Sequence, residues 1–411
     1  MGFIGGDEVG ALVLDVGAHS FRAGYGGEDT VKVLESSQIG VTDENEFRVP
    51  LNFYQHRDDL DVRSVASFDG KQVVYDPKAL AAVMHYACHK ALPYVDVSNS
   101  PLIMTEPNRV TPGVRKLMYE TAFEDVGVPS FFALKKAVAA CFSVGRSSGV
   151  VLDVGASHVS VTPVFETFSL QRGVQEHAFA GDSLDMVVAS LLEQRGLHVG
   201  PKFGLGDGRV RPSYVNAAIQ RTIIQPLKHD NMKTNESPIP ASAFTAWQYQ
   251  GPMAMETAGP QVHELPDGTK LDVSGIASLV PELLFEPLHL AASPLARVEV
   301  SGNFQGVAST LADAVCAVDI DARKTVASEI VVCGGSTAFA KFPERLQRSL
   351  DSTIFPKVKI TAMPAAIDRI SASWLGCSIA SSLATFQHQW ISKSQYYEHG
   401  ADRLVDKLVL Y

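Results

Sequence analysis

The chain has 411 residues, which is too long for one ordinary hydrophobic core, and its 46% hydrophobic content can fill two large lobes. A formal charge of −10 argues against a broad nucleic-acid-binding face, because such faces neutralise phosphates with lysine and arginine. The sequence has no long uncharged apolar run and no recognisable signal peptide, so we expect a soluble, intracellular protein without a membrane span.

The first predicted elements are short strands between residues 9 and 33, rich in valine, leucine and glycine. Within them, residues 13–18 read Val-Leu-Asp-Val-Gly-Ala and lead into a second apolar run. This pattern predicts a strand, a tight glycine turn and a returning strand. The polar stretch 35–69 has no clear periodicity and predicts a small surface insertion.

Helical spacing predicts helices over 77–91 and 112–125, with a buried strand at 101–105 between them. A further helix is expected over 135–144. The next strand carries residues 151–156, which repeat the hexapeptide Val-Leu-Asp-Val-Gly-Ala in full. The repeat predicts that one half of the molecule is built like the other.

Residues 200–266 lack clear periodicity and are rich in glycine, proline, serine and asparagine, which predicts a second, larger insertion. Order returns with a turn between strands at 264–268. A strand at 330–333 then leads into a third glycine turn, and an apolar helix is expected over 374–385.

The two predicted hairpins suit a phosphate chain held between them. Glycine lets backbone amides approach phosphate oxygens, and Asp15 and Asp153 can hold a divalent cation through water. An aspartate before glycine at a strand end is also a common turn former, which is the simpler alternative. The duplication and the third glycine loop favour the phosphate-binding interpretation.

Together, these residues resemble the actin family, and the similarity extends along most of the chain. The hairpins resemble the family's paired phosphate loops, and Gly334-Gly335-Ser336 resembles its adenosine loop. The opening residues and 21–25 are most similar to nuclear members of the family. The resemblance implies an α/β, actin-like fold with two lobes, duplicated inner subdomains and a nucleotide cleft between them. Further similar stretches lie at 102–107, 145–149, 264–268 and 386–393.

On this resemblance, the first lobe comprises 1–136 and 370–411, with a small outer insertion at about 35–69. The second lobe comprises 137–369, with a large outer insertion at about 182–271. The implied cofactors are ATP or ADP with Mg²⁺, which Asp15 and Asp153 would hold through water. The implied nucleotide-binding residues are Asp15, Gly17, Ala18, His19, Arg22, Lys136, Asp153, Gly155, Ala156, Ser157, Gly181, Asp182, Gly334, Gly335 and Ser336.

The chain departs from the family at the residues that position the attacking water. Lys136 replaces a glutamine, Ser160 a histidine and Ala156 an aspartate. Loss of a positioned proton acceptor commonly slows a reaction roughly 100- to 10,000-fold, so we expect nucleotide binding with slow or absent hydrolysis and no catalytic residue. Lys136 is either a γ-phosphate anchor or a helix residue that extends to solvent, and His19 either contacts phosphate or is solvated.

The family also has a hydrophobic groove between its inner subdomains that accepts partner helices. By resemblance, its walls here are Phe142, Phe168, Leu375, Ile379 and Leu383. The last three are four residues apart and would share one helical face. An ordinary core face is the alternative.

The resemblance implies a nuclear, non-catalytic subunit of chromatin-remodelling or histone-acetyltransferase complexes, with a cytoplasmic pool left open. Its expected partners are actin, a scaffold helix from a remodelling ATPase or an acetyltransferase-complex subunit, and histones or nucleosomes. Direct DNA binding, membrane binding and a homopolymer are not expected. The alternatives are a cytoskeletal, filament-forming ATPase and, behind it, a sugar kinase or chaperone ATPase with the same core.

Overall fold

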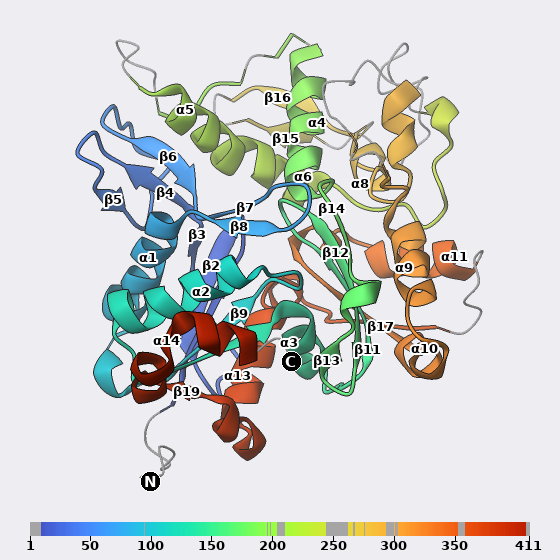
Figure 1. The fold of residues 1–411 in the computed structure, drawn as a ribbon. Coiled ribbons are helices and arrows are strands. Elements are labelled where there is room, and N and C mark those ends of the chain that lie inside the picture. The colour runs from blue at the N-terminus through green and yellow to red at the C-terminus, as the bar shows by residue number, and fades with distance from the viewer. Residues whose placement is uncertain are drawn as a thin grey trace.

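Figure 1 shows two lobes side by side, each built around a twisted sheet. The computed structural model of the chain describes residues 10–93, 95–194, 196–197, 199–203, 210–243, 262–265, 268–274, 276–292, 300, 303–351 and 358–407. No helix within these ranges is long and apolar enough to span a membrane.

The first lobe contains a six-stranded sheet, in which β1, β9 and β10 run parallel and β2 returns antiparallel to β1. All residues of β1 are buried, because helices cover both faces of the sheet. In spatial order the strands are β19 (Ile391–Ser392), β10 (Ser130–Lys135), β9 (Leu102–Glu106), β1 (Leu12–Val16), β2 (Ser20–Tyr25) and β3 (Val33–Ser36).

The second lobe repeats this arrangement. An antiparallel hairpin, β11–β12, is again followed by two parallel strands, and this confirms the duplication predicted from the repeated hexapeptide. The strands are β13 (Phe168–Ser169), β12 (Val159–Phe165), β11 (Gly149–Val154), β17 (Glu329–Cys333) and β18 (Lys359–Ala362), and β14 (Gln175–His177) also pairs with β12.

The helices of the first lobe begin where the sequence predicted. α1 (Pro77–Tyr86) continues as a π-helical segment to Ala91, and α2 (Pro112–Glu120) continues in the same way to Val126. Asp76 and Thr111 cap their first turns by accepting backbone N–H groups, and a proline follows each cap. A further helix of this lobe, α14 (Lys393–Lys407), had no counterpart among the predicted elements.

The small insertion contains more regular structure than its polar sequence indicated. β4 (Gln38–Val41), β5 (Phe47–Arg48) and β6 (Asp61–Ser64) form a three-stranded sheet. A second hairpin follows, β7 (Ala66–Phe68) with β8 (Val73–Tyr75). These strands are short and partly exposed, so the alternation of apolar and polar residues is weak.

The second lobe is mainly helical outside its sheet. The predicted turn between strands at 264–268 is confirmed, because β15 (Val262–Glu264) pairs with β16 (Lys270–Asp272). Its helices are α4 (Gly181–Gln194), α5 (Pro212–Ile219), α6 (Gln225–Asn231), α8 (Leu279–Glu282), α9 (Val307–Cys316), α10 (Ile320–Val326), α11 (Phe342–Asp351) and α12 (Ala366–Ile370).

The segment 200–266, predicted as an insertion without clear periodicity, contains regular structure in its middle part. Residues 212–231 form one helical run, in which a π-helical segment joins α5 to α6. The run is buried on several sides, and Gln225 and Lys228 are buried polar residues that face the other lobe and α4. Polar residues at buried positions interrupt the apolar periodicity that identifies a helix in a sequence.

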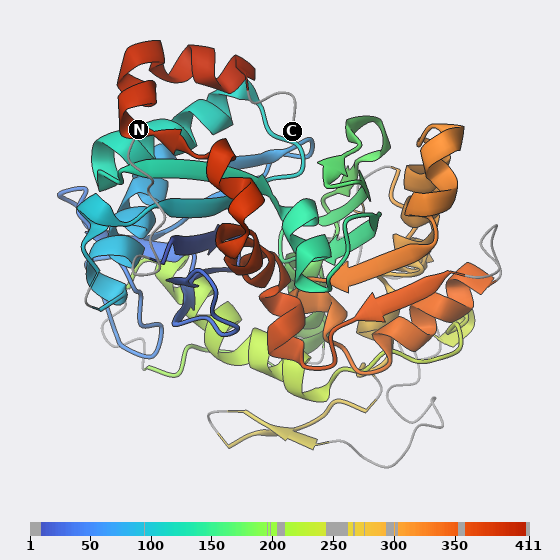
Figure 2. The same ribbon diagram turned by 90° about the horizontal axis from the view of Figure 1, so that it is seen from below.

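Two helices join the lobes at their base, where Figure 2 shows them in the centre of the molecule. α3 (Lys136–Ser143) packs against α13 (Ala372–Ser382) so closely that a Cβ on Gly376 would lie 1.7 Å from the Ala139 carbonyl oxygen. Trp374 of α13 is fully buried and donates from its indole nitrogen to the Val13 carbonyl at 3.2 Å.

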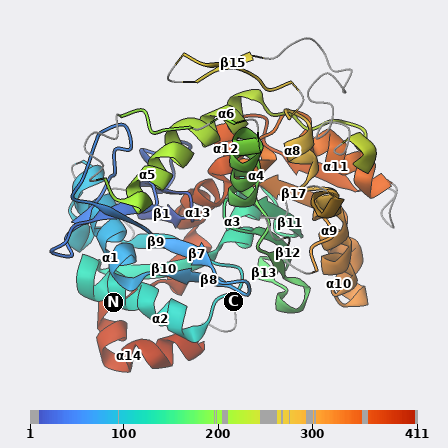
Figure 3. The ribbon, with the colours of Figure 1, turned by 90° about the horizontal axis from the view of Figure 1, so that it is seen from above.

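The two outer insertions also contact each other across the mouth of the cleft, and Figure 3 shows α5 beside the strands of the small insertion. The hydroxyl of Tyr214 donates to the carbonyl oxygens of Asn52 and Gln55 at 2.8 and 2.7 Å, and Arg211 pairs with Asp61. We call the apolar contact the bridging cluster: Leu51, Phe53, Leu60, Phe203, Val210, Tyr214, Ala217 and Ala218.

Candidate functional site

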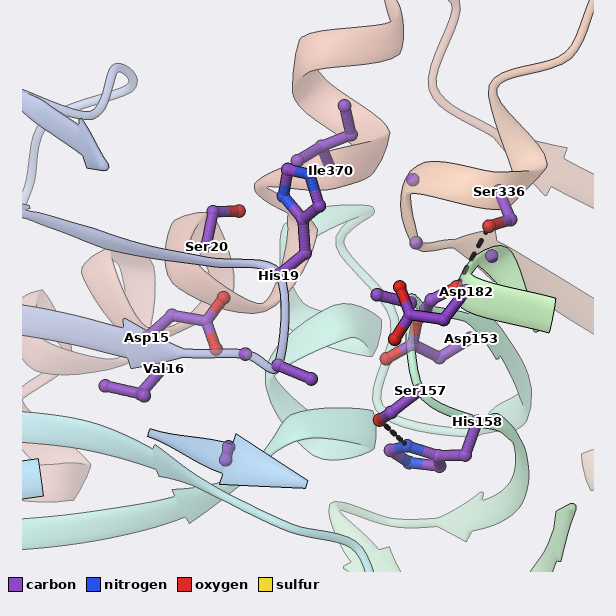
Figure 4. A pocket seen from close by; sticks show the side chains of 18 of the residues that line it. Asp15, Val16, His19, Ser20, Asp153, Ser157, His158, Asp182, Ser336 and Ile370 are labelled. Carbon is purple, nitrogen blue, oxygen red and sulfur yellow. Dashed lines mark hydrogen bonds between the residues drawn. The ribbon is translucent and has the colours of Figure 1, made fainter. Parts of the chain in front are cut away.

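A cavity of about 370 Å³ lies between the two hairpins and receives side chains from both lobes. Every residue of the predicted nucleotide-binding set lines it, from Asp15 in the first hairpin to Ser336 in the third glycine loop. In Figure 4, Asp15 and Asp153 come from opposite sides of this space, and Asp182 and Ser336 lie on the side of Asp153. The structure therefore brings together residues that are more than 300 positions apart.

The loops of the second lobe lie against one another with little free space. Gly334 has φ 93°, and a Cβ there would lie 2.3 Å from Oδ1 of Asp153. The Ser336 hydroxyl donates to the Gly155 carbonyl at 2.9 Å, and the backbone N–H of Gly181 donates to the same oxygen at 3.1 Å. Glycine is required at position 334 because this backbone conformation is strained for other residues.

Asp15 is held by three neighbours, and its side chain is almost fully buried. The Thr105 hydroxyl donates to its Oδ1 at 2.6 Å, and the Arg22 guanidinium donates to its Oδ2 at 2.9 Å. Nζ of Lys136 lies 3.1 Å from Oδ1. Burial raises the pKa of Asp15, but Lys136 and Arg22 outweigh burial and lower this pKa to about 2.

Lys136 points into the cavity and does not extend to solvent. Its Nζ donates to the Val16 carbonyl at 3.0 Å in addition to the contact with Asp15, and its side chain is 19% exposed. It stands at the start of α3, directly after the last strand residue of β10. Of the two interpretations of this lysine, the solvent-facing one does not fit the structure.

The other two acidic residues of the set differ from Asp15. The carboxylate of Asp153 makes no hydrogen bond or ion pair with any residue that the structure describes, and burial raises its pKa. Asp182, at the start of α4, also has a pKa raised by burial and by nearby Asp185. A positively charged group near these two carboxyl groups would therefore favour their ionised forms.

His19 is not solvated, as one interpretation of the hairpin tip had suggested. Its Nε2 lies 2.9 Å from Oε1 of Gln225 and 2.7 Å from a guanidinium nitrogen of Arg221. Burial and the charge of Arg221 lower the pKa of His19 to about 3, so the ring is neutral at physiological pH. The first hairpin is thereby connected to the helical run of the opposite lobe.

Sequence reasoning missed several residues of the cavity. Arg221, Gln225 and Lys228 come from the helical run that the periodicity did not reveal, and Lys228 forms a buried ion pair with Asp185 at 2.5 Å. His158 stacks on Phe68 of the opposite lobe, with ring centroids 4.8 Å apart. Burial lowers the pKa of His158 to about 4. No local motif identifies these contacts.

Ser160 and Ala156 stand at positions where, by resemblance, the family has residues that order the attacking water. Ser160 is buried and accepts a hydrogen bond from the Asn108 amide at 3.0 Å, and it is not among the residues that line the cavity. Ala156 lines the cavity but offers only a methyl group. These two side chains thus provide no proton acceptor within the cavity.

The expected Mg²⁺ site does not fit at Asp15. Both carboxylate oxygens are already engaged by cationic or hydroxyl donors, and the positive charges of Arg22 and Lys136 beside them would repel a divalent cation. No group of three or more His, Cys, Asp or Glu side chains in the described ranges is arranged to hold a metal. Asp153 and Asp182 line the cavity as well, and both differ from Asp15 in having a pKa raised by burial.

Two of the predicted groove residues, Phe142 and Phe168, lie beside Phe386. Phe168 is 43% exposed and lines a small cavity between the lobes together with Phe132, Phe386 and Gln389. Phe142 contacts Phe386, with ring centroids 5.6 Å apart, but lies outside that cavity. Two further members, Leu375 and Ile379 on α13, are only partly buried.

The shared helical face proposed for Leu375, Ile379 and Leu383 is wrong at its last member. α13 ends at Ser382, and Leu383 has an extended backbone. The hydroxyls of Ser381 and Ser382 both donate to the Ser378 carbonyl and compete with the backbone bonds that would continue the helix.

The comparison with known families agrees with this architecture, because the family model of actin matches residues 6–409. The chain belongs to the actin family. The two-lobed, actin-like α/β fold expected from the sequence is therefore confirmed.

Relatives within the actin family are similar over nearly their whole length. Actin-related protein 4 of Yarrowia lipolytica is 27% identical, with 98% of this chain and 96% of that protein covered. Actin-related protein 4 of Arabidopsis thaliana is 26% identical, with coverage of 98% and 99%. The SWI/SNF and RSC complexes subunit arp42 of Schizosaccharomyces pombe is 25% identical, with coverage of 97% and 98%. The resemblance to the actin family is thus confirmed, and several of the relatives are actin-related protein 4.

Proposed function

We propose that the chain is a nucleotide-binding, non-hydrolysing actin-related subunit of nuclear chromatin-remodelling or histone-acetyltransferase complexes. The observation that carries this proposal is the cavity between the lobes, which collects both phosphate hairpins and the third glycine loop but offers no proton acceptor from Ser160 or Ala156. Binding without rapid hydrolysis follows if hydrolysis depends on positioning a water molecule.

ATP or ADP is the ligand that this cavity suits best. The glycine turns at 17, 155 and 334–335 line the cavity, and the absence of side chains there lets phosphate oxygens approach the backbone closely. Lys136 and Arg22 supply positive charge beside the first turn. Arg221, Lys228 and Arg369 add basic groups around the remaining wall.

The assignment to chromatin complexes rests on the relatives. Several are actin-related protein 4, and one is a subunit of SWI/SNF and RSC complexes. By analogy we propose that a scaffold helix from a remodelling ATPase or an acetyltransferase-complex subunit recruits this chain beside actin, and that the assembly engages histones or nucleosomes. The acidic charge of −10 would favour basic partners.

Four measurements test the proposal. Purified protein should bind ATP in a fluorescence titration, release phosphate at a rate close to the background, and stay in the supernatant after centrifugation in polymerising salt. Affinity purification from nuclear extract should bring down a remodelling ATPase or acetyltransferase subunits together with actin. Rapid phosphate release with pelleting, and a cytoskeletal set of partners, would instead support the filament-forming ATPase.

A further inference from the structure

Lys136 lines the cavity beside the first hairpin, and Asp153 lines the same cavity from the second lobe. Its Nζ lies 3.1 Å from Oδ1 of Asp15 and donates to the Val16 carbonyl at 3.0 Å. A Cβ on Gly17 would lie 3.9 Å from this Nζ and 3.8 Å from a guanidinium nitrogen of Arg22. Two cationic groups therefore stand directly behind the first glycine turn.

Asp15 balances only one of these charges. Its Oδ2 accepts a hydrogen bond from Arg22 at 2.9 Å, and its Oδ1 lies 3.1 Å from Nζ of Lys136. Arg22 and Lys136 carry one positive charge each, so the three side chains together keep a net positive charge beside the turn. An anionic phosphate chain is attracted to this arrangement, whereas a divalent cation placed beside Lys136 would be repelled by it.

A divalent cation normally serves a bound nucleotide by neutralising its phosphates and by contacting acidic residues through water. Here the ammonium group of Lys136 already contacts Asp15, and Lys136 and Asp153 line the same cavity. The same ammonium group donates a hydrogen bond to the carbonyl oxygen of Val16, a residue that lines the cavity. The Lys136 ammonium group is thus placed to neutralise the phosphates, which is the role that the cation would have.

We infer that this chain binds its nucleotide without a divalent cation, and that the Lys136 ammonium neutralises the phosphates in place of Mg²⁺. The inference rests on the proposed nucleotide binding and specifies the form of the ligand, namely the free nucleotide polyphosphate. Excess Mg²⁺ then weakens binding, because it sequesters the free form. The protein differs in this respect from sites in which a magnesium–nucleotide complex is the ligand.

The test is a titration of the full chain with a fluorescent ATP analogue, in excess EDTA and again in excess MgCl₂. The wild-type protein should bind at least as tightly in EDTA as in MgCl₂. Lys136→Gln should lose affinity about tenfold or more in EDTA, and MgCl₂ should restore part of this loss, since the cation can then approach Asp15 and Asp153. Electron paramagnetic resonance with Mn²⁺ adds a readout of the ion itself, and wild type with ATP should immobilise little Mn²⁺.

Lys116→Gln is the matched control, because Lys116 lies on the exposed face of α2 in the same lobe and pairs with Asp402. It should leave both affinities unchanged. Wild-type binding that disappears in EDTA, or Mn²⁺ immobilised stoichiometrically with ATP, overturns the inference while leaving the proposed nucleotide binding intact. An absence of ATP binding in both buffers overturns the proposed function and this inference together. A melting curve of Lys136→Gln distinguishes lost affinity from lost folding.

Discussion

Tyr214 is the residue through which the bridging cluster can be tested. It belongs to α5 in the large insertion, yet its side chain is fully buried against Phe53 and its hydroxyl donates to two carbonyls of the small insertion. Separation of the two insertions would expose this side chain and break these hydrogen bonds. Because the cluster lies across the mouth of the cleft, we expect Tyr214→Ala to accelerate nucleotide release.

The size of the effect follows from the buried ring. Replacing a fully buried aromatic residue by alanine costs about 3–5 kcal/mol. If nucleotide release requires the two insertions to separate, the substitution destabilises the closed form relative to the open form by up to this amount. A loss of about 3 kcal/mol corresponds to a nucleotide release rate roughly 150-fold higher. Tyr214→Phe keeps the ring and loses about 1 kcal/mol of hydrogen bonding, which predicts a roughly fivefold increase.

The assay preloads the protein with a fluorescent ATP analogue and follows its release in a stopped-flow instrument after excess ATP is added. Tyr397→Ala is the control, because Tyr397 is 62% exposed on α14 and far from the insertions in sequence. Identical release from wild type and Tyr214→Ala would refute the reasoning. A lower melting temperature with an unchanged release rate would mean that the cluster only stabilises the insertions.

Three further predictions concern stability. Gly376→Ala should lower the free energy of unfolding by more than about 3 kcal/mol in a denaturant titration, because the added Cβ would overlap the Ala139 carbonyl. Gly113→Ala on α2 is the control: its Cβ would have no neighbour within 4 Å, so this variant should be as stable as wild type or more stable. Arg345→Met should cost about 3–5 kcal/mol, because it leaves the buried carboxylate of Glu282 unpaired, and a normal melting temperature would contradict this. Burial raises the pKa of Glu176 from 4.5 to about 7, so the folded state retains a proton that the unfolded state loses, and stability falls as pH rises through this window. Glu176→Gln should therefore be more stable than wild type by about 3 kcal/mol above pH 7 and equal to it near pH 4, and equal curves at both pH values would exclude this explanation.

Local patterns in the sequence predicted the parts of the site that depend on neighbouring residues. Asp15 and Asp153 each precede a glycine at the end of an apolar run, and the repeated hexapeptide by itself relates the two hairpins to each other. Glycine at 334 followed in the same way from a strand and a turn. Such features depend on a few consecutive residues, so a sequence can reveal them.

Contacts between distant segments could not be predicted in this way. The ion pair between Asp15 and Lys136 joins positions 121 residues apart, and the proposal that Lys136 takes the place of Mg²⁺ depends on it. Tyr214 meets Asn52 and Gln55 across 162 and 159 residues. The periodicity of the sequence did not reveal the helix that carries Gln225 and Lys228, because polar side chains occupy its buried positions. Gln225 contacts His19 of the other lobe, and Lys228 pairs with Asp185 of α4.

The close approach of Gly376 to Ala139 at the base of the cleft has a consequence for how the molecule unfolds. With helices α3 and α13 in contact at one end and the bridging cluster at the other, neither lobe can lose its core without exposing apolar surface on its neighbour. The halves should therefore denature together, as one cooperative transition in calorimetry with equal calorimetric and van't Hoff enthalpies, although the chain is long enough for two independent domains.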